Sequence, residues 1–251
     1  MIRKLLSSLA LVVAASTASA GNINLIEVEG QAPILHYFGP VTQGDAQGLQ
    51  SYIQWYQPQK VVMTSEGGSS REGYMIAQVL SQASMHVEVP KGYMCMSACA
   101  VGFLGGATKT VEGILGFHVM YIPGEVPEHY AATAGQQTGL QDAHVSLENG
   151  YNLMLFNMVA YLTSPSDFLV FTSEEELAVF KVTDPYNIVW SFLEEPEFFR
   201  EMDDEDVYKW FTERVLPPKE LQKLVEKQRV EVAIAKSLEP DRPEFYTRDD
   251  E

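Results

Sequence analysis

Residues 60–80 read KVVMTSEGGSSREGYMIAQVL, and this stretch predicts a buried strand, a glycine turn and a helix in succession. Its apolar start suits a short buried strand, and apolar residues recur later at the spacing of one helical face. Ser69 and Glu72 have the spacing of a capping box, which marks the start of the helix. Gly67 and Gly68 allow the backbone to turn sharply between the two elements.

The same alternation of strand and helix continues on both sides of this stretch. Further strands are expected at 34–38, 85–89 and 113–121, and further helices at 45–56, 96–104, 139–162 and 219–238. Such alternation favours an α/β fold with a mostly parallel sheet.

The composition is that of an acidic globular protein. Of 251 residues 46% are apolar, which suffices for a packed core. The chain has 34 acidic and 17 basic residues, and affinity for phosphate comes from basic groups. This balance excludes a sequence-independent nucleic-acid binder and disfavours anionic lipid surfaces. Two cysteines are too few for a disulfide framework, so we expect an enzyme or a binder of peptides or small molecules.

The N-terminus has the pattern of a secretory signal peptide. Arg3 and Lys4 precede an apolar run at 5–15, and residues 18–20 (ASA) match the A-x-A cleavage pattern. A buried N-terminal helix is the alternative interpretation. Such a signal predicts a periplasmic location, and secretion beyond the periplasm is the alternative. After cleavage behind Ala20, no stable membrane insertion of the mature chain is expected.

Charge density divides the mature chain into two parts. Residues 21–192 hold only five basic residues and form the predicted α/β domain. Residues 193–251 hold ten basic and eighteen acidic residues and form a predicted helical C-terminal extension. We expect this extension to pack on the core or on a neighbouring subunit; a dedicated partner-binding motif is the alternative.

Two of three short segments that suggest a reactive site involve helix starts. The turn at 64–69 (TSEGGS) exposes N–H groups beside a helix N-terminus, where a phosphate or an oxyanion can be stabilised. It lacks the spacing of a P-loop, and an ordinary turn is the alternative. In 94–100 (MCMSACA), Ser97 opens a small-residue helix whose dipole favours negative charge on its oxygen. The alternative is that Ser97 is only an N-cap.

The third segment, 115–118 (LGFH), ends an apolar strand with a histidine. His118 is either a core residue or a general base at the carboxyl edge of the sheet, where α/β proteins build their sites. The histidines lack the H-E-x-x-H spacing of a zinc hydrolase, so neither a metal nor another cofactor is expected.

The order and spacing of these motifs, S-x-G-G, C-x-S-A-C and G-F-H, resemble the Clp protease proteolytic subunit family. They look most like its secreted members, which are predicted to be periplasmic. The resemblance spans roughly residues 34–184 and implies the crotonase-like fold of repeated ββα units. It also implies that Ser97 is the nucleophile, that His118 is the base and that Ala98, with Gly67 or Gly68, forms the oxyanion hole.

The family carries an acidic third member of the triad after the long helix. Asp167 is the best match and would orient His118, although an aspartate before a helix is commonly a turn or cap residue. A Ser–Lys dyad is the alternative in this superfold.

Cys95 and Cys99 flank the candidate nucleophile. At i and i+4 of a helix their Cα atoms would lie about 6 Å apart, near the upper limit for a disulfide. In an oxidising compartment they either pair and brace the turn or remain as buried thiols. The C-x-x-C spacing of a disulfide oxidoreductase is absent.

The leading hypothesis is a periplasmic serine peptidase that acts on peptides or proteins through an acyl-enzyme intermediate. The alternative is a catalytically inactive Clp-like fold used for binding or assembly. An acyl-CoA enzyme is disfavoured because the core has few basic residues to hold phosphates. The family resemblance implies a homo-oligomer, and no ATPase partner is assumed in the periplasm.

Overall fold

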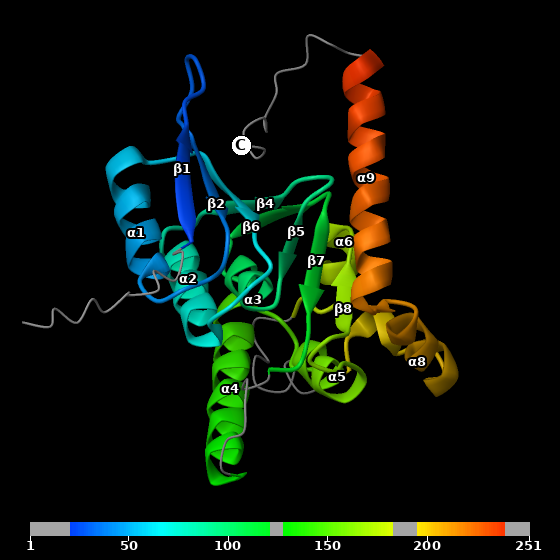
Figure 1. Cartoon of the computed structure of the whole chain (residues 1–251). Helices are drawn as coiled ribbons and strands as arrows, with labels where there is room; N and C mark the ends of the chain where they lie inside the picture. Colours follow the sequence, from blue (N-terminus) through cyan, green and yellow to red (C-terminus); the bar gives the residue numbers. More distant parts are fainter. Residues whose placement is uncertain (1–20, 121–127, 183–194, 239–251) are drawn as a thin grey trace, which may run out of the picture.

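The computed structural model describes residues 21–120, 128–182 and 195–238 and has the α/β architecture that the sequence predicts (Figure 1). Its first sheet has the strand order β1-β2-β3-β4-β6. The strands are β1 (Asn22–Ile26), β2 (Ile34–Phe38), β3 (Lys60–Thr64), β4 (His86–Val89) and β6 (Thr108–Val111). Strand β1 pairs antiparallel with β2, and all other pairs in this sheet are parallel.

A second sheet has the order β5-β7-β8-β9 and is mixed. It contains β5 (Met94–Met96), β7 (Ile114–Phe117), β8 (Phe168–Phe171) and β9 (Val215–Leu216). Only β5 and β7 run parallel, whereas β8 and β9 pair antiparallel to their neighbours. The expectation of a mostly parallel sheet therefore holds for the first sheet only. Strands β8 and β9 are short, and their direction depends on where the preceding helices return the chain, which no local pattern reveals.

The helices flank these sheets (Figure 1). They are α1 (Asp45–Tyr56), α2 (Ser70–Gln82), α3 (Ala98–Leu104), α4 (Glu128–Asn149), α5 (Met154–Leu162), α6 (Glu174–Ala178), η1 (Glu197–Phe199), α8 (Asp204–Thr212) and α9 (Pro218–Leu238). Helix α4 projects from one end of the molecule, and α9 runs along the side of the second sheet (Figure 1).

The helix expected at 139–162 is two helices. Gly150 has φ +68°, a left-handed conformation that ends α4. The N–H of Met154 then donates to Oδ1 of Asn152 (2.7 Å), which starts α5 in a new direction. The apolar periodicity of both helices hides this break from the sequence. The helix expected at 96–104 begins only at Ala98, because the residues before it form β5.

The C-terminal extension packs on the α/β core, which is one of the two alternatives expected for it. Phe199 and Phe211 are fully buried in the main hydrophobic cluster. Leu221 and Val225 of α9 cover a smaller cluster on the second sheet. The boundary at residue 193 stays a prediction, and residues 1–20, the predicted signal peptide, lie outside the described residues. Within the described ranges, no helix has the length and apolar character that crossing a membrane requires.

Candidate active site

Ser97 is the single residue between β5 and α3. Its backbone has φ +55° and ψ −123°, a conformation that costs energy for any residue with a side chain. The N–H of Ser97 donates to the Gly116 carbonyl on β7 (2.8 Å), and the Ser97 carbonyl accepts from the N–H of Val101 (3.1 Å). This sharp strand-to-helix turn is held from both sides and leaves Oγ at the edge of the sheet.

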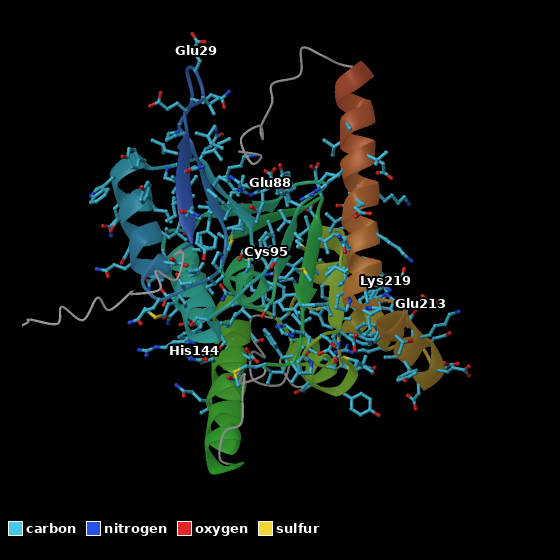
Figure 2. The ribbon with its side chains drawn as sticks, in the orientation of Figure 1. Glu29, Glu88, Cys95, His144, Glu213 and Lys219 are labelled. Carbon is cyan, nitrogen blue, oxygen red and sulfur yellow. A yellow bond between two sulfur atoms is a disulfide. The ribbon has the colours of Figure 1, made fainter. Side chains whose placement is uncertain are left out.

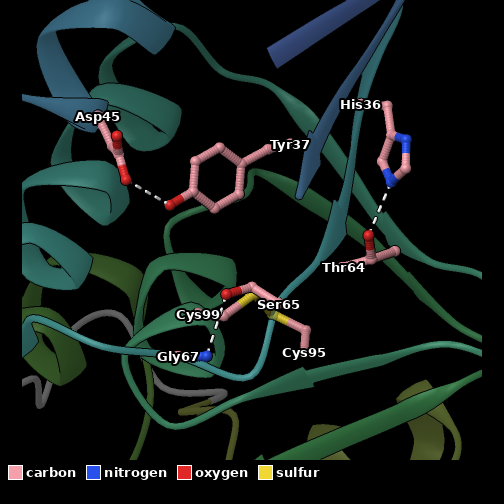
Figure 3. The surroundings of a disulfide bond; sticks show 8 residues. All are labelled: His36, Tyr37, Asp45, Thr64, Ser65, Gly67, Cys95 and Cys99. Carbon is pink, nitrogen blue, oxygen red and sulfur yellow. Dashed lines mark hydrogen bonds between the residues drawn. A yellow bond between two sulfur atoms is a disulfide. The ribbon is translucent and has the colours of Figure 1, made fainter. Parts of the chain in front are cut away.

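A disulfide joins the residues that flank this turn. Cys95 and Cys99 are fully buried, their Cα atoms lie 5.2 Å apart, and a bond connects their sulfur atoms. Figure 2 shows Cys95 in the interior of the molecule, and Figure 3 shows the disulfide beside Ser65. The backbone of Ser65 makes two hydrogen bonds to β5: its N–H donates to the Met94 carbonyl, and its carbonyl accepts from the Met96 N–H (2.9 Å each). The glycine turn and the serine turn are therefore fixed to one another.

His118 lies directly after β7, within hydrogen-bond distance of the serine. Nε2 of His118 is 2.7 Å from Oγ of Ser97, and Nδ1 is 3.0 Å from the carbonyl oxygen of Pro165. A carbonyl only accepts, so Nδ1 carries the proton and Nε2 is left to accept from the serine hydroxyl. Burial lowers the pKa of His118, and the hydrogen bond to Pro165 partly opposes this. The imidazole is therefore neutral at neutral pH, as a general base must be.

The third position is filled by a backbone group where the sequence analysis expected the carboxylate of Asp167. That carboxylate instead accepts from Oγ of Ser164 (2.7 Å), which in turn accepts from the N–H groups of Ser166 and Asp167 (3.2 Å each). Asp167 thus closes the turn that presents the Pro165 carbonyl to His118. The expectation that Asp167 contacts His118 directly is wrong: Asp167 supports the turn instead. The reason is that a Ser-Pro-Ser-Asp segment satisfies its polar groups locally.

The glycine turn presents a backbone N–H beside Ser97. The N–H of Gly67 is occupied by Oγ of Ser65 (3.0 Å; Figure 3). For the N–H groups of Gly68 and Ala98 there is no hydrogen-bond partner among the described residues. Of the two glycines proposed for an oxyanion hole, Gly68 is therefore the one with a free donor. Gly67 is required for close packing against Ser97, because a Cβ at position 67 would lie 2.6 Å from Cβ of Ser97.

Two cavities meet at this site. The larger, of about 990 Å³, is bordered by Phe38, Tyr93 and, from α9, Arg229. The smaller, of about 480 Å³, lies between α3, α4 and α5. Among the described residues, the two cavities share three lining residues: Gly68, Ser97 and His118. A ligand chain crossing from one cavity to the other would therefore pass over the serine hydroxyl.

No lysine in the described part of the chain lies at the site, as the alternative Ser–Lys dyad would require. Lys60 pairs with Glu88 and Lys91 with Glu231. Lys109 and Lys181 donate to backbone carbonyls, and none of these lysines borders either cavity. Across the described ranges, no cluster of His, Cys, Asp or Glu side chains is suited to hold a metal ion.

No protein-family model matches the chain, and no curated protein matches it in sequence. One solved structure that resembles it is a mutant of the 1510-N membrane-bound stomatin-specific protease. The two chains share 17% identity with a TM-score of 0.40, over 58% of this chain and 74% of the other.

Sequence reasoning missed the Pro165 carbonyl and the smaller cavity. A backbone carbonyl has no side-chain signature, although the Ser164-Pro165 pair marks a turn in the sequence. The cavity depends on the break between α4 and α5, which the expected single helix concealed.

Proposed function

We propose that the protein is a serine hydrolase that cleaves peptides, with Ser97 as nucleophile and His118 as general base. The observation that carries the proposal is the 2.7 Å contact between Oγ of Ser97 and Nε2 of His118, with Nδ1 bonded to a carbonyl. A nucleophile, a base within reach and a group that orients the base together define this chemistry.

In the first step the Ser97 hydroxyl gives its proton to Nε2 of His118 while Oγ bonds to the substrate carbonyl carbon. The carbonyl oxygen becomes an oxyanion, which the N–H groups of Gly68 and Ala98 would stabilise beside the start of α3. The imidazolium then donates its proton to the leaving amine as the C–N bond breaks. A water molecule, deprotonated by the same histidine, hydrolyses the acyl-enzyme and restores Ser97.

The Pro165 carbonyl would stabilise the imidazolium less than a carboxylate does, because it carries only a partial negative charge. It still fixes the tautomer that accepts the serine proton. We therefore propose a Ser–His dyad supported by a carbonyl, and not a complete Ser–His–Asp triad.

A peptide is the favoured substrate because two cavities border the serine and could hold residues of an extended chain. The acidic composition favours neutral or basic ligands over anionic ones. The motif resemblance to Clp proteases supports the same class, and we propose the Clp-like arrangement of ββα units and a periplasmic location on that basis. The weaker third group favours the inactive, binding form of this fold as the second candidate.

Hydrolysis of a library of fluorogenic peptides tests the proposal. We expect the wild-type chain, prepared without residues 1–20, to cleave members of the library, and Ser97→Ala to cleave none. Ser51→Ala on α1, remote from both cavities, is the matched control and should behave as wild type. Absence of cleavage by folded wild-type protein would favour the binding protein instead.

A further inference from the structure

The smaller cavity beside Ser97 has apolar walls. Val101 of α3, Phe117 of β7, and Phe156 and Val159 of α5 border it. Gly68, Ser97 and Ala98, the residues that would surround a substrate carbonyl, also border it. A side chain adjoining that carbonyl is therefore the part of a substrate that this cavity is placed to receive.

The lining also contains polar residues, and Asp142 is the one carboxylate among the described ones. Asp142 of α4 borders the cavity and is largely screened from solvent. Its carboxylate makes neither a hydrogen bond nor an ion pair with any of the residues that the structure describes. Burial raises the pKa of Asp142 to about 7, since no neighbouring charge compensates it.

The other charged or titratable groups along this cavity are Arg71 of α2 and His118, which directly follows β7. Arg71 is exposed and forms no ion pair with Asp142 within the described residues. His118 is engaged by Ser97 and Pro165. Asp142 thus borders a mostly apolar space, where an unpaired charge is costly and binding of an incoming cation is favourable.

We propose that this cavity binds the substrate side chain next to the scissile bond and that Asp142 selects lysine or arginine there. The methylene stem of either residue would contact the apolar walls, while the cationic head would reach the carboxylate. The inference rests on the proposed function, because it uses Ser97 to mark where the scissile carbonyl lies.

The test compares three fluorogenic peptides that differ only at the residue before the cleaved bond: lysine, norleucine and glutamate. Norleucine keeps all four carbons of the lysine side chain and removes the ammonium group. We expect kcat/KM for lysine to exceed that for norleucine at least about tenfold, as a buried charge-assisted hydrogen bond implies. The glutamate peptide should be the poorest of the three.

Asp142→Asn should bring the lysine-to-norleucine ratio close to one, since the amide keeps the shape and removes the charge. Asp204→Asn, at an exposed position on α8, is the matched control and should keep the wild-type ratio. If Asp142→Asn does not fold, the wild-type ratio alone still decides between the outcomes.

Two outcomes separate this inference from the function on which it rests. Cleavage that depends on Ser97, with a lysine-to-norleucine ratio near one, overturns the role of Asp142 and leaves the hydrolase intact. No cleavage of any peptide overturns the hydrolase. Titration of Ser97→Ala with the lysine and norleucine peptides then decides the cavity by itself: tighter binding of lysine that Asp142→Asn abolishes supports it, and equal binding overturns it.

Discussion

Nδ1 of His118 lies 3.0 Å from the carbonyl oxygen of Pro165, so a backbone group holds the imidazole that accepts from Ser97. This relationship fixes the tautomer through a backbone oxygen. It also makes the site depend on the conformation of a short turn, which Ser164 and Asp167 close through their side chains.

The turn should tolerate loss of the Asp167 charge. Asp167→Asn retains an oxygen that accepts from Ser164, so we expect kcat/KM to fall by about tenfold or less, against the roughly 10⁴-fold loss known for a triad aspartate. His118→Ala should reduce it to background. Steady-state kinetics on one peptide measures all of these, and a loss near 10⁴-fold in Asp167→Asn would show that the carboxylate acts on His118 directly.

Activity should persist into mildly acidic solution. Burial lowers the pKa of His118 below its ordinary value of 6.5, so the imidazole stays unprotonated at a lower pH than an exposed histidine would. We expect the acid limb of kcat/KM against pH to have its midpoint below 6.5. A midpoint above that value would mean that the imidazolium is stabilised in the free enzyme by a negative charge.

Gly67 should be irreplaceable for steric reasons. It has φ +99°, and an added Cβ would lie 2.6 Å from Cβ of Ser97 and 2.7 Å from the Met96 carbonyl oxygen. We expect Gly67→Ala to abolish cleavage and to lower the free energy of unfolding by more than the ~1 kcal/mol of a positive φ alone. Gly30→Ala is the control, because Gly30 has φ +72° and open space around it. Equal destabilisation of both variants in chemical denaturation would contradict the clash.

Loss of the disulfide should weaken the site as well as the fold. The loop between Cys95 and Cys99 is short, so we expect the double Cys→Ala variant to lose about 2 kcal/mol of unfolding free energy. The strained backbone of Ser97 would then be held by hydrogen bonds alone, and kcat should fall with little change in KM. Denaturation curves and kinetics of the two proteins measure this, and unchanged kcat would show that the disulfide serves stability only.

Much of the first sheet and its helices is predictable from the sequence. The bounds of α1 (Asp45–Tyr56) and β2 (Ile34–Phe38) are those expected, because their apolar periodicity is local. Motif spacing and the family resemblance predict the pairing of Ser97 with His118, and the structure brings the two side chains together.

What escaped prediction depends on contacts between distant segments. The direction of β8 depends on where the chain emerges from α5. The position of α5 in turn depends on the left-handed conformation of Gly150. The partner of His118 is a backbone carbonyl, for which Asp167 was the nearest side-chain candidate. Asp142 shows no motif at all, and only the arrangement of α3, α4 and α5 makes it part of a cavity.

Intact-mass analysis after treatment with a fluorophosphonate tests the central claim most directly. We predict one adduct per chain, located at Ser97 by peptide mapping, absent from Ser97→Ala and formed far more slowly in His118→Ala. An adduct at another residue, or none on wild-type protein whose fold is verified by circular dichroism, would contradict a nucleophilic Ser97.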